Sequence, residues 1–255
     1  MKIKYYLITG ILALALFLTA NIPAASMASV LKAQLPQVNM QNVSGTLWQG
    51  SAQQVTVHGH VFRNVNWSVC TTHLLMARAC VEFDALYNNS PLSGQLSVGP
   101  SQTLEGKDIK AEMNAHTLGQ LAALPMGEIA GDVSLDLTSL SWQPGGVPAL
   151  NGIVKWSNAS VTIAEMARLG DITITLAESD ENPINATVSN QNGQLAIAGQ
   201  ASLGANTGYQ VDLQLTPQNG ASNNLKSSLS LFAKPQSNGQ YLLKNSGNLK
   251  QLGLM

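Results

Sequence analysis

The chain has 255 residues, of which 45% are hydrophobic, 11% charged and 5% aromatic. An average soluble domain carries about 25% charged residues, and this low-charge, apolar-rich composition argues against an intrinsically disordered chain. The 13 basic and 14 acidic residues nearly cancel and form no Lys/Arg cluster, which argues against a nucleic-acid partner.

The N-terminal segment determines the expected compartment. Lys2 and Lys4 precede an apolar stretch over residues 5–24, and no charged residue follows before Lys32. About 18 apolar residues at 1.5 Å rise give a helix of about 27 Å, close to a hydrocarbon core of about 30 Å. We therefore expect a cytoplasmic N-terminus over 1–4, a transmembrane anchor over 5–24 and an exported β-rich domain over 25–255.

A cleaved signal peptide is the alternative for this segment. Small residues at Ala24, Ala25, Ser26 and Ala28 would supply a cleavage site, but the apolar run is longer than the usual 7–15 residues. In either case the rest of the chain is exported. Without Lys2 and Lys4 it is mildly acidic, so it has no electrostatic drive toward anionic lipid headgroups.

Beyond the anchor, residues 26–36 indicate a short helix that ends before Pro36. From residue 38 onward apolar and polar residues alternate, which predicts antiparallel strands with one face buried and one solvated. The clearest strands are expected at 43–48, 54–57, 61–69, 93–98, 132–140, 151–156, 161–163, 171–176, 186–188, 195–198, 209–215, 225–231 and 241–244.

Three segments break this alternation, at residues 73–78, 116–124 and 164–169, and each fits a helical turn or short helix. Segments 143–148 and 179–183 are rich in Pro and Gly or in acidic residues, and indicate surface turns. The expected fold class is mainly β: an elongated antiparallel β-sheet domain built as a curved sheet, a sandwich or a partly open roll.

The chain has two cysteines, Cys70 and Cys80, and an even number in an exported chain indicates one disulfide. Closing so short a loop stabilises the fold by about 2–3 kcal/mol in the chain-entropy model. Two cysteines alone do not complete a zinc site, and their spacing is not that of a CxxC motif.

Residues 44–52 and 151–159 form a faint internal repeat, in which Gly, an apolar strand, Trp, a small residue and Ala follow in order. In the first copy we expect Gly45 to open a strand and Gly50 to permit a turn after Trp48. Aromatic side chains dominate cores and interfaces. The candidates for structural or partner-contact roles are therefore Gly45, Trp48, Gly50, Trp67, Gly152 and Trp156.

Sites for chemistry are sparse in this sequence. His58 and His60 form HGH, which in a strand would place both on one solvent-exposed face, and no Asp or Glu lies nearby as a third metal ligand. No GxSxG, Walker loop, HExxH or calcium loop is present. We therefore expect no catalytic residue, no metal and no cofactor, and a protein that is not an enzyme.

The order of motifs resembles that of protein N of the bacterial type II secretion system, also called general secretion pathway protein N. The resemblance rests on the basic N-terminus with its apolar span, VSGTLWQGSA over 43–52 and LNGIVKWSNA over 150–159. It continues through NNLKSSLSLFAK over 223–234 and NGQYLLK over 238–244. The motifs extend along nearly the whole chain and are fairly specific only in combination.

This resemblance implies a single-pass inner-membrane protein with its bulk in the periplasm, which contacts other secretion subunits while folded proteins cross the outer membrane. No catalytic residue comes with the family. Glycine-led amphipathic strands behind an anchor are also similar to periplasmic lipid-transport bridges. A lipid-binding β-groove protein is therefore the alternative function, with lipid as the alternative partner.

Overall fold

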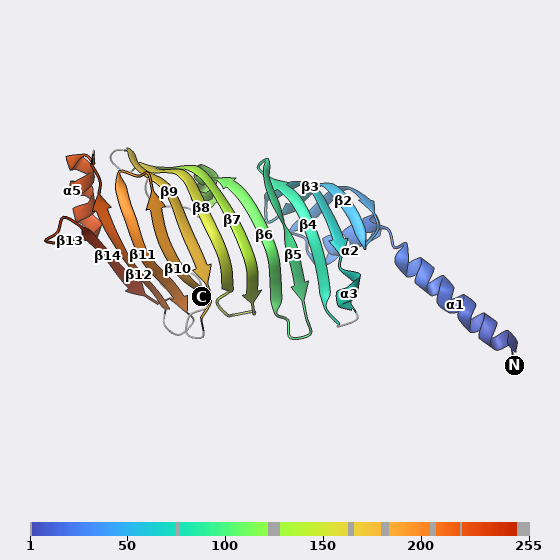
Figure 1. The fold of residues 1–255 in the computed structure, drawn as a ribbon. Coiled ribbons are helices and arrows are strands. Elements are labelled where there is room, and N and C mark those ends of the chain that lie inside the picture. Colours follow the sequence, from blue (N-terminus) through green and yellow to red (C-terminus); the bar gives the residue numbers. More distant parts are fainter. Residues whose placement is uncertain are drawn as a thin grey trace. The chain divides into compact units, whose positions relative to one another are not determined.

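A computed structural model describes residues 2–74, 77–121, 128–162, 166–179, 184–204, 208–219 and 221–248 (Figure 1). The chain divides into two compact units, Met1–Ser97 and Val98–Met255. Strands dominate both units, so the predicted mainly β fold class is confirmed.

Unit 1 begins with two helices and continues as a sheet whose strands follow one another in chain order. Neighbouring strands from β1 to β4 pair antiparallel, as the short connections between them require. Its elements are α1 (Lys2–Ala20), α2 (Ala24–Gln34), β1 (Val38–Gly45), β2 (Gln49–Val57), β3 (His60–Val69), α3 (Thr71–Leu74), β4 (Ala79–Tyr87) and β5 (Ser90–Val98).

Unit 2 forms a longer sheet, in which the strands keep chain order up to β12 and are then followed by β14 and β13. Its elements are β6 (Leu104–Asn114), α4 (Ala115–Leu121), β7 (Glu128–Trp142), β8 (Ala149–Thr162), β9 (Met166–Ala177), β10 (Ile184–Gln191), β11 (Leu195–Gly204), β12 (Gly208–Pro217), α5 (Asn223–Phe232), β13 (Lys234–Pro235) and β14 (Tyr241–Gly247).

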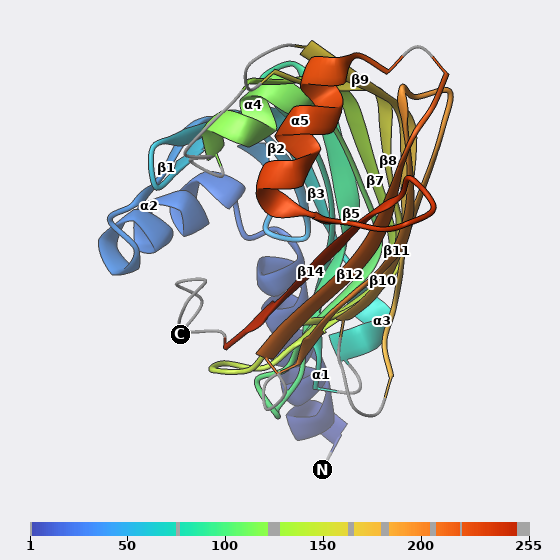
Figure 2. The ribbon, with the colours of Figure 1, turned by 90° about the vertical axis from the view of Figure 1, so that its left-hand side faces the viewer.

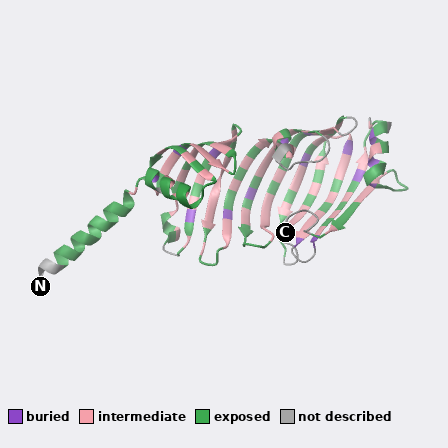
Figure 3. Cartoon of the chain, turned by 180° about the vertical axis from the view of Figure 1, so that it is seen from behind, coloured by how far each residue is buried: buried purple, intermediate pink, exposed green. Residues whose placement is uncertain are grey.

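Period-two patterning explains why these segments are strands. In β6, Ile109, Ala111 and Met113 are half-buried, whereas Lys110 and Glu112 between them are exposed. Of the forms expected from sequence, the described strands match an open sheet rather than a sandwich or roll, because they form one linear strand order that does not close on itself. Among the described residues, buried ones are few and lie scattered over the strands and in helices α2, α4 and α5, so most apolar residues are covered only in part (Figure 3).

The helix predicted before Pro36 is confirmed as α2, which ends at Gln34. The helix predicted at 116–124 is confirmed as α4 over its described part, and that at 73–78 corresponds to α3, shifted toward Thr71. Residues 75, 76 and 122–127 lie outside the described residues.

The prediction of a strand at 225–231 is wrong, because this segment is helix α5. Ser222 caps the helix by accepting a hydrogen bond from the Leu225 amide, at 2.9 Å. Leu225 and Leu229, four residues apart, then face the sheet together, while Leu231 is 86% exposed. The alternation of Leu and Ser in the sequence concealed this helical spacing.

The prediction of a helix at 164–169 is also wrong, because Met166–Leu169 belong to β9. Met166 and Ala167 pair with Thr162 and Val161 of β8, so tertiary pairing overrides the local helical pattern. Residues 163–165 lie outside the described residues.

The helix predicted over 5–24 ends earlier than expected. α1 stops at Ala20, where the Asn21 amide still donates to the Phe17 carbonyl at 3.2 Å, and Pro23 precedes the separate helix α2. None of the helices described is both long enough and apolar enough to span a membrane.

Candidate functional site: the hairpin tip of unit 1

The hairpin that joins β1 to β2 carries three of the predicted candidates, and we call residues 45–50 the hairpin tip. Gly45 ends β1 with φ +84°, and a Cβ there would lie 2.6 Å from the Gln49 carbonyl oxygen. Gly50 already lies in β2, opposite Gly45. The expectation that Gly45 opens a strand and Gly50 permits the turn is therefore wrong, since the turn lies between them.

The hairpin tip is tied to the segment that links the two N-terminal helices. The Leu47 amide donates to the Ile22 carbonyl at 2.9 Å, and Thr46 forms a β-bridge with Pro23. The half-buried Trp48 donates its indole N–H to the carbonyl of Thr19, the penultimate residue of α1, at 2.8 Å. Trp48 therefore connects α1 to the sheet of unit 1.

Trp67 on β3 secures the other side of the hairpin tip. It lies directly opposite Gly50, where an added Cβ would come within 2.5 Å of its Cζ2 atom. Its indole N–H donates to the Leu47 carbonyl at 3.2 Å. The Trp67 indole can lie this close to the backbone only because Gly50 has no Cβ.

Unit 2 repeats this arrangement with other residues. Trp156 on β8 donates its indole N–H to the Ala130 carbonyl at 2.9 Å, and a Cβ on Gly131 would lie 2.8 Å from that nitrogen. Gly152, the predicted partner in the repeat, instead lies within β8 opposite Leu137. The structural equivalents are therefore the indole–glycine contacts Trp67–Gly50, which lie directly opposite each other, and Trp156–Gly131, where Gly131 lies at a register shift of β7. The sequence repeat of 44–52 and 151–159 does not correspond to them.

A shallow hollow lies beside the hairpin tip on the polar face of the unit 1 sheet. Its lining includes Ser44 and Ser51, whose hydroxyls are 2.9 Å apart, and Asn66, which donates to Asp84 at 2.7 Å. The described lining holds no histidine to act as a base for these hydroxyls. The arrangement offers hydroxyl, amide and carboxylate groups to a polar partner.

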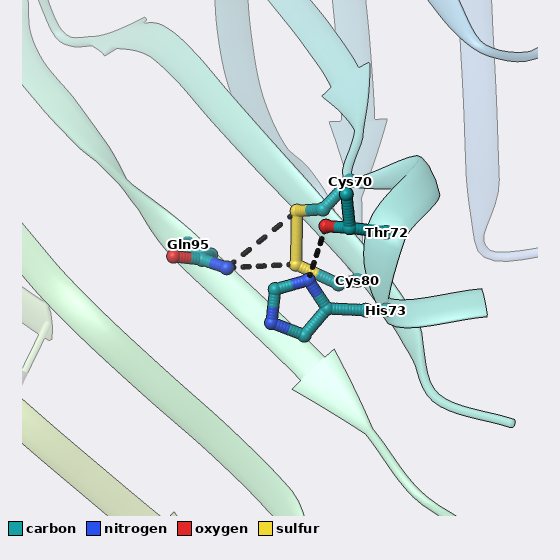
Figure 4. Close-up of a disulfide and its surroundings, with 5 residues drawn as sticks. All are labelled: Cys70, Thr72, His73, Cys80 and Gln95. Carbon is teal, nitrogen blue, oxygen red and sulfur yellow. Dashed lines mark hydrogen bonds between the residues drawn. A yellow bond between two sulfur atoms is a disulfide. The ribbon is translucent and has the colours of Figure 1, made fainter. Parts of the chain in front are cut away.

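Cys70 and Cys80 are joined by the expected disulfide, with their Cα atoms 5.2 Å apart (Figure 4). Gln95 of β5 donates to Cys80 Sγ at 2.8 Å, and the His73 ring reaches the same cluster. Metals bind cysteine as the thiolate, which the disulfide removes, so the cluster acts here as a link between the end of β3 and β4.

His58 and His60 are both exposed, as expected, but the reason differs. His58 has φ +49° and lies in the turn between β2 and β3, so the two residues are not on one strand face. His60 instead pairs its Nδ1 with the Tyr87 hydroxyl at 3.0 Å. This contact links β3 to β4.

Strand β1 lies at one end of the strand order, hydrogen-bonded to β2 on one side. It contains no charged residue and no proline, and Asn39 and Gln41 are exposed. Within the described chain, α2 also packs against β1. An edge strand without charge or proline is open to pairing with another chain. The sequence predicts such pairing at an exposed strand edge but does not identify β1 as that edge, because strand order is not visible in a sequence.

Comparison with known proteins gives one consistent result. The family model described as "Type II secretion system (T2SS), protein N" matches residues 36–244. The chain is 24% identical to a type II secretion system protein N of Pectobacterium carotovorum subsp. carotovorum, over 98% of this chain and 100% of that protein. It is 24% identical to one of Aeromonas hydrophila, over 91% and 93% respectively. No solved structure matches the chain.

Proposed function

Because the chain belongs to the type II secretion system protein N family, we propose that it is a non-catalytic component that supports export of folded proteins across the outer membrane. The observation that carries this proposal is the family match over 36–244, which covers most of each unit. The proposal that it is not an enzyme is supported by a sequence without reaction motifs.

We propose that the chain lies at the inner membrane, with residues 1–4 in the cytoplasm, residues 5–24 in the membrane and residues 25–255 in the periplasm. All side chains of α1 from Tyr5 to Ala20 are exposed, and the large apolar side chains of Leu12 and Phe17 are 62% and 64% exposed. Such a surface favours an apolar environment, and Lys2 and Lys4 precede it. The Cys70–Cys80 disulfide fits an oxidising compartment.

Contact with other secretion subunits is proposed to occur through the edge of β1 that faces away from β2, where no described strand pairs with it. A partner strand added there gains backbone hydrogen bonds, and alternating side chains supply specificity. The neighbouring hairpin tip is held by Trp48 and Trp67, so the end of this edge is fixed before a partner arrives. A preformed edge lowers the conformational entropy lost on binding.

The test is a deletion strain that is complemented in turn by the full chain and by matched variants. Asn39→Lys with Gln41→Lys adds charge to the β1 edge at two exposed positions, and Ser246→Lys adds charge to exposed β14 as a control. The β1 variant should leave several-fold less exoprotein in the medium and copurify fewer secretion subunits, whereas Ser246→Lys should match the full chain.

Normal secretion of every exoprotein by the deletion strain, together with a tagged chain that copurifies no secretion subunit, would remove the support for this function. If secretion falls on deletion but both lysine variants behave as the full chain does, the secretion role stands and the β1 edge is the wrong surface.

A further inference from the structure

The sheet of unit 2 carries an unbroken line of apolar residues, one from each of eight strands. Each member lies directly opposite the next in the antiparallel register, so the line crosses the sheet at right angles to the strands. We call it the central apolar row, and its members are Ala111, Leu135, Val154, Ile174, Val188, Gly199, Leu213 and Leu243.

The central apolar row is sheltered but not covered along most of its length. Every member is half-buried, being neither fully exposed nor fully buried. At one end, α5 packs on the sheet and buries Leu195 and Leu215 to 4% and 5% exposure. At the other end, α4 packs on β6 and β7, and both helices lie on the same side of the strands (Figure 2). Within the described residues, the members in β8–β11 belong neither to the buried cluster under α5 nor to the partly buried residues that pack against it.

The polar groups that border this row are already satisfied by the backbone. Asn190, two residues from Val188 on the same face, donates to the carbonyls of Leu169 and Leu195 at 2.5 and 2.7 Å and accepts from the Ile197 amide at 2.6 Å. The Trp156 indole N–H is likewise bonded within the unit. The described face therefore leaves no buried side-chain donor or acceptor for an occupant. A hydrocarbon fits such a surface, whereas a peptide strand needs hydrogen-bond partners.

The dimensions also favour an acyl chain. Eight strands about 4.8 Å apart give a row of roughly 34 Å. An acyl chain that spans one leaflet of a hydrocarbon core about 30 Å thick is roughly 15 Å long, so the row can hold its whole length. Three small residues lie near the middle of the row, where Ala186 faces Ala201 and Gly199 faces Val188. Larger neighbours, Leu176 on β9 and Leu213 on β12, flank them. This low centre suits a thin chain of methylene groups better than a helix, which is about 10–12 Å wide.

We propose that the central apolar row of unit 2 binds the acyl chain of a membrane phospholipid. This site is separate from the β1 edge and does not depend on the secretion role. The contact is hydrophobic burial of methylene groups on half-buried side chains, at about 0.8 kcal/mol for each CH₂ that leaves water.

The test places a benzoylphenylalanine photo-crosslinker at Ile174 or, as the matched control, at Thr175 of the full chain in cells. Ile174 is in the row, and Thr175 is the exposed next residue of β9, on the opposite face. After irradiation and purification, intact-mass analysis should show at least ten-fold more phospholipid adduct from position 174. An adduct with another protein or with a second copy, equal lipid from both positions, or no lipid adduct from position 174 would overturn the proposal.

A second experiment uses binding to defined vesicles. Val188→Asp puts a carboxylate in the row, and Thr187→Asp puts one on the exposed face of the same strand. Full-length variants are incubated with vesicles of phosphatidylethanolamine and phosphatidylglycerol and then repurified, and bound phospholipid is counted on material whose unfolding temperature matches that of the parent. Val188→Asp should bind several-fold less than Thr187→Asp. Equal binding by the two folded variants contradicts the proposal, and if Val188→Asp does not fold, the crosslinking result decides.

Discussion

The two units are both open antiparallel sheets, but different interactions hold them. In unit 1, specific links between neighbouring elements fix one end of the sheet: the Cys70–Cys80 disulfide and the indole bonds of Trp48 and Trp67. In unit 2, the buried cluster forms where α5 covers the sheet around Leu215, and the middle of the apolar face stays half-exposed. Specific bonds thus fix one end of the unit 1 sheet, whereas the middle of the apolar face of unit 2 is only half-buried.

The strands at the two ends of the strand order differ in how open they are to pairing with another chain. β1 has eight residues and no charge. At the other end, β13 has only two residues, Lys234 and Pro235, and Lys244 on β14 forms an ion pair with Asp212 at 2.8 Å. Short strands, lysine and proline discourage pairing with another chain. This difference is why the proposed partner contact is at β1.

The largest loss of stability is expected from removing the packing of helix α5 on the sheet of unit 2. Leu229→Ala deletes a side chain that is 2% exposed, which should lower the free energy of unfolding by about 2–5 kcal/mol. Leu231→Ala, at an 86% exposed position of the same helix, should change it by less than about 0.5 kcal/mol. Urea unfolding monitored by hydrogen exchange would measure both. Equal effects from the two variants would mean that α5 does not hold unit 2 through Leu229.

The next largest loss of stability is expected from removing the disulfide of unit 1. Replacing Cys70 and Cys80 together by Ser releases a disulfide between residues ten apart, which should cost about 2–3 kcal/mol of stability. Hydrogen exchange should increase in β3 and β4, while β11 and β12 of unit 2 serve as the internal control. Faster exchange spread evenly over both units would contradict the view that the link acts locally.

Gly50→Ala tests the contact beneath the Trp67 indole. The added methyl would lie 2.5 Å from Cζ2, so we expect a loss of about 1–3 kcal/mol through overpacking. Trp67→Phe removes that part of the ring, so the double variant should be less destabilised than the sum of the two single variants. Strict additivity in chemical unfolding would show that the two residues do not make this contact.

The smallest effect concerns the bond between the hairpin tip and α1. Trp48→Phe keeps an aromatic ring but loses the indole N–H that donates to the Thr19 carbonyl, for an expected cost of about 1 kcal/mol. Hydrogen exchange at the C-terminal end of α1 should speed up, while β4 is unchanged. An unchanged exchange rate at Asn21 and Ile22 would mean that Trp48 does not secure α1.

Most strands of the fold were predictable because their side chains alternate in a simple period of two, as in residues 132–140 of β7. α5 was not, because Leu229 and Leu231 imitate that alternation and only the cap at Ser222 and packing against Leu195 favour the helix. The alternation identifies which residues share a face, but not whether another element covers that face.

The sequence predicted several residues of the candidate site, but not which of them contact one another. The sequence identified Gly50, Trp67 and Trp156 as framework residues, and the structure places each indole over a glycine of the preceding strand. Gly131, the partner of Trp156, was missed because cross-strand neighbours depend on hairpin length and bulges. The register shift between Ala130 and Asp132 is such an irregularity.

The proposal that β1 is the edge joined by another secretion subunit is tested most directly by crosslinking in cells. A photo-crosslinker would replace exposed Gln41 on β1 or, as a control, exposed Ser246 on β14, in a strain with an intact secretion system. We predict a covalent adduct with a secretion subunit from position 41 and none from position 246. No subunit captured from position 41, or the same subunit captured equally from both positions, would contradict the proposed role of β1.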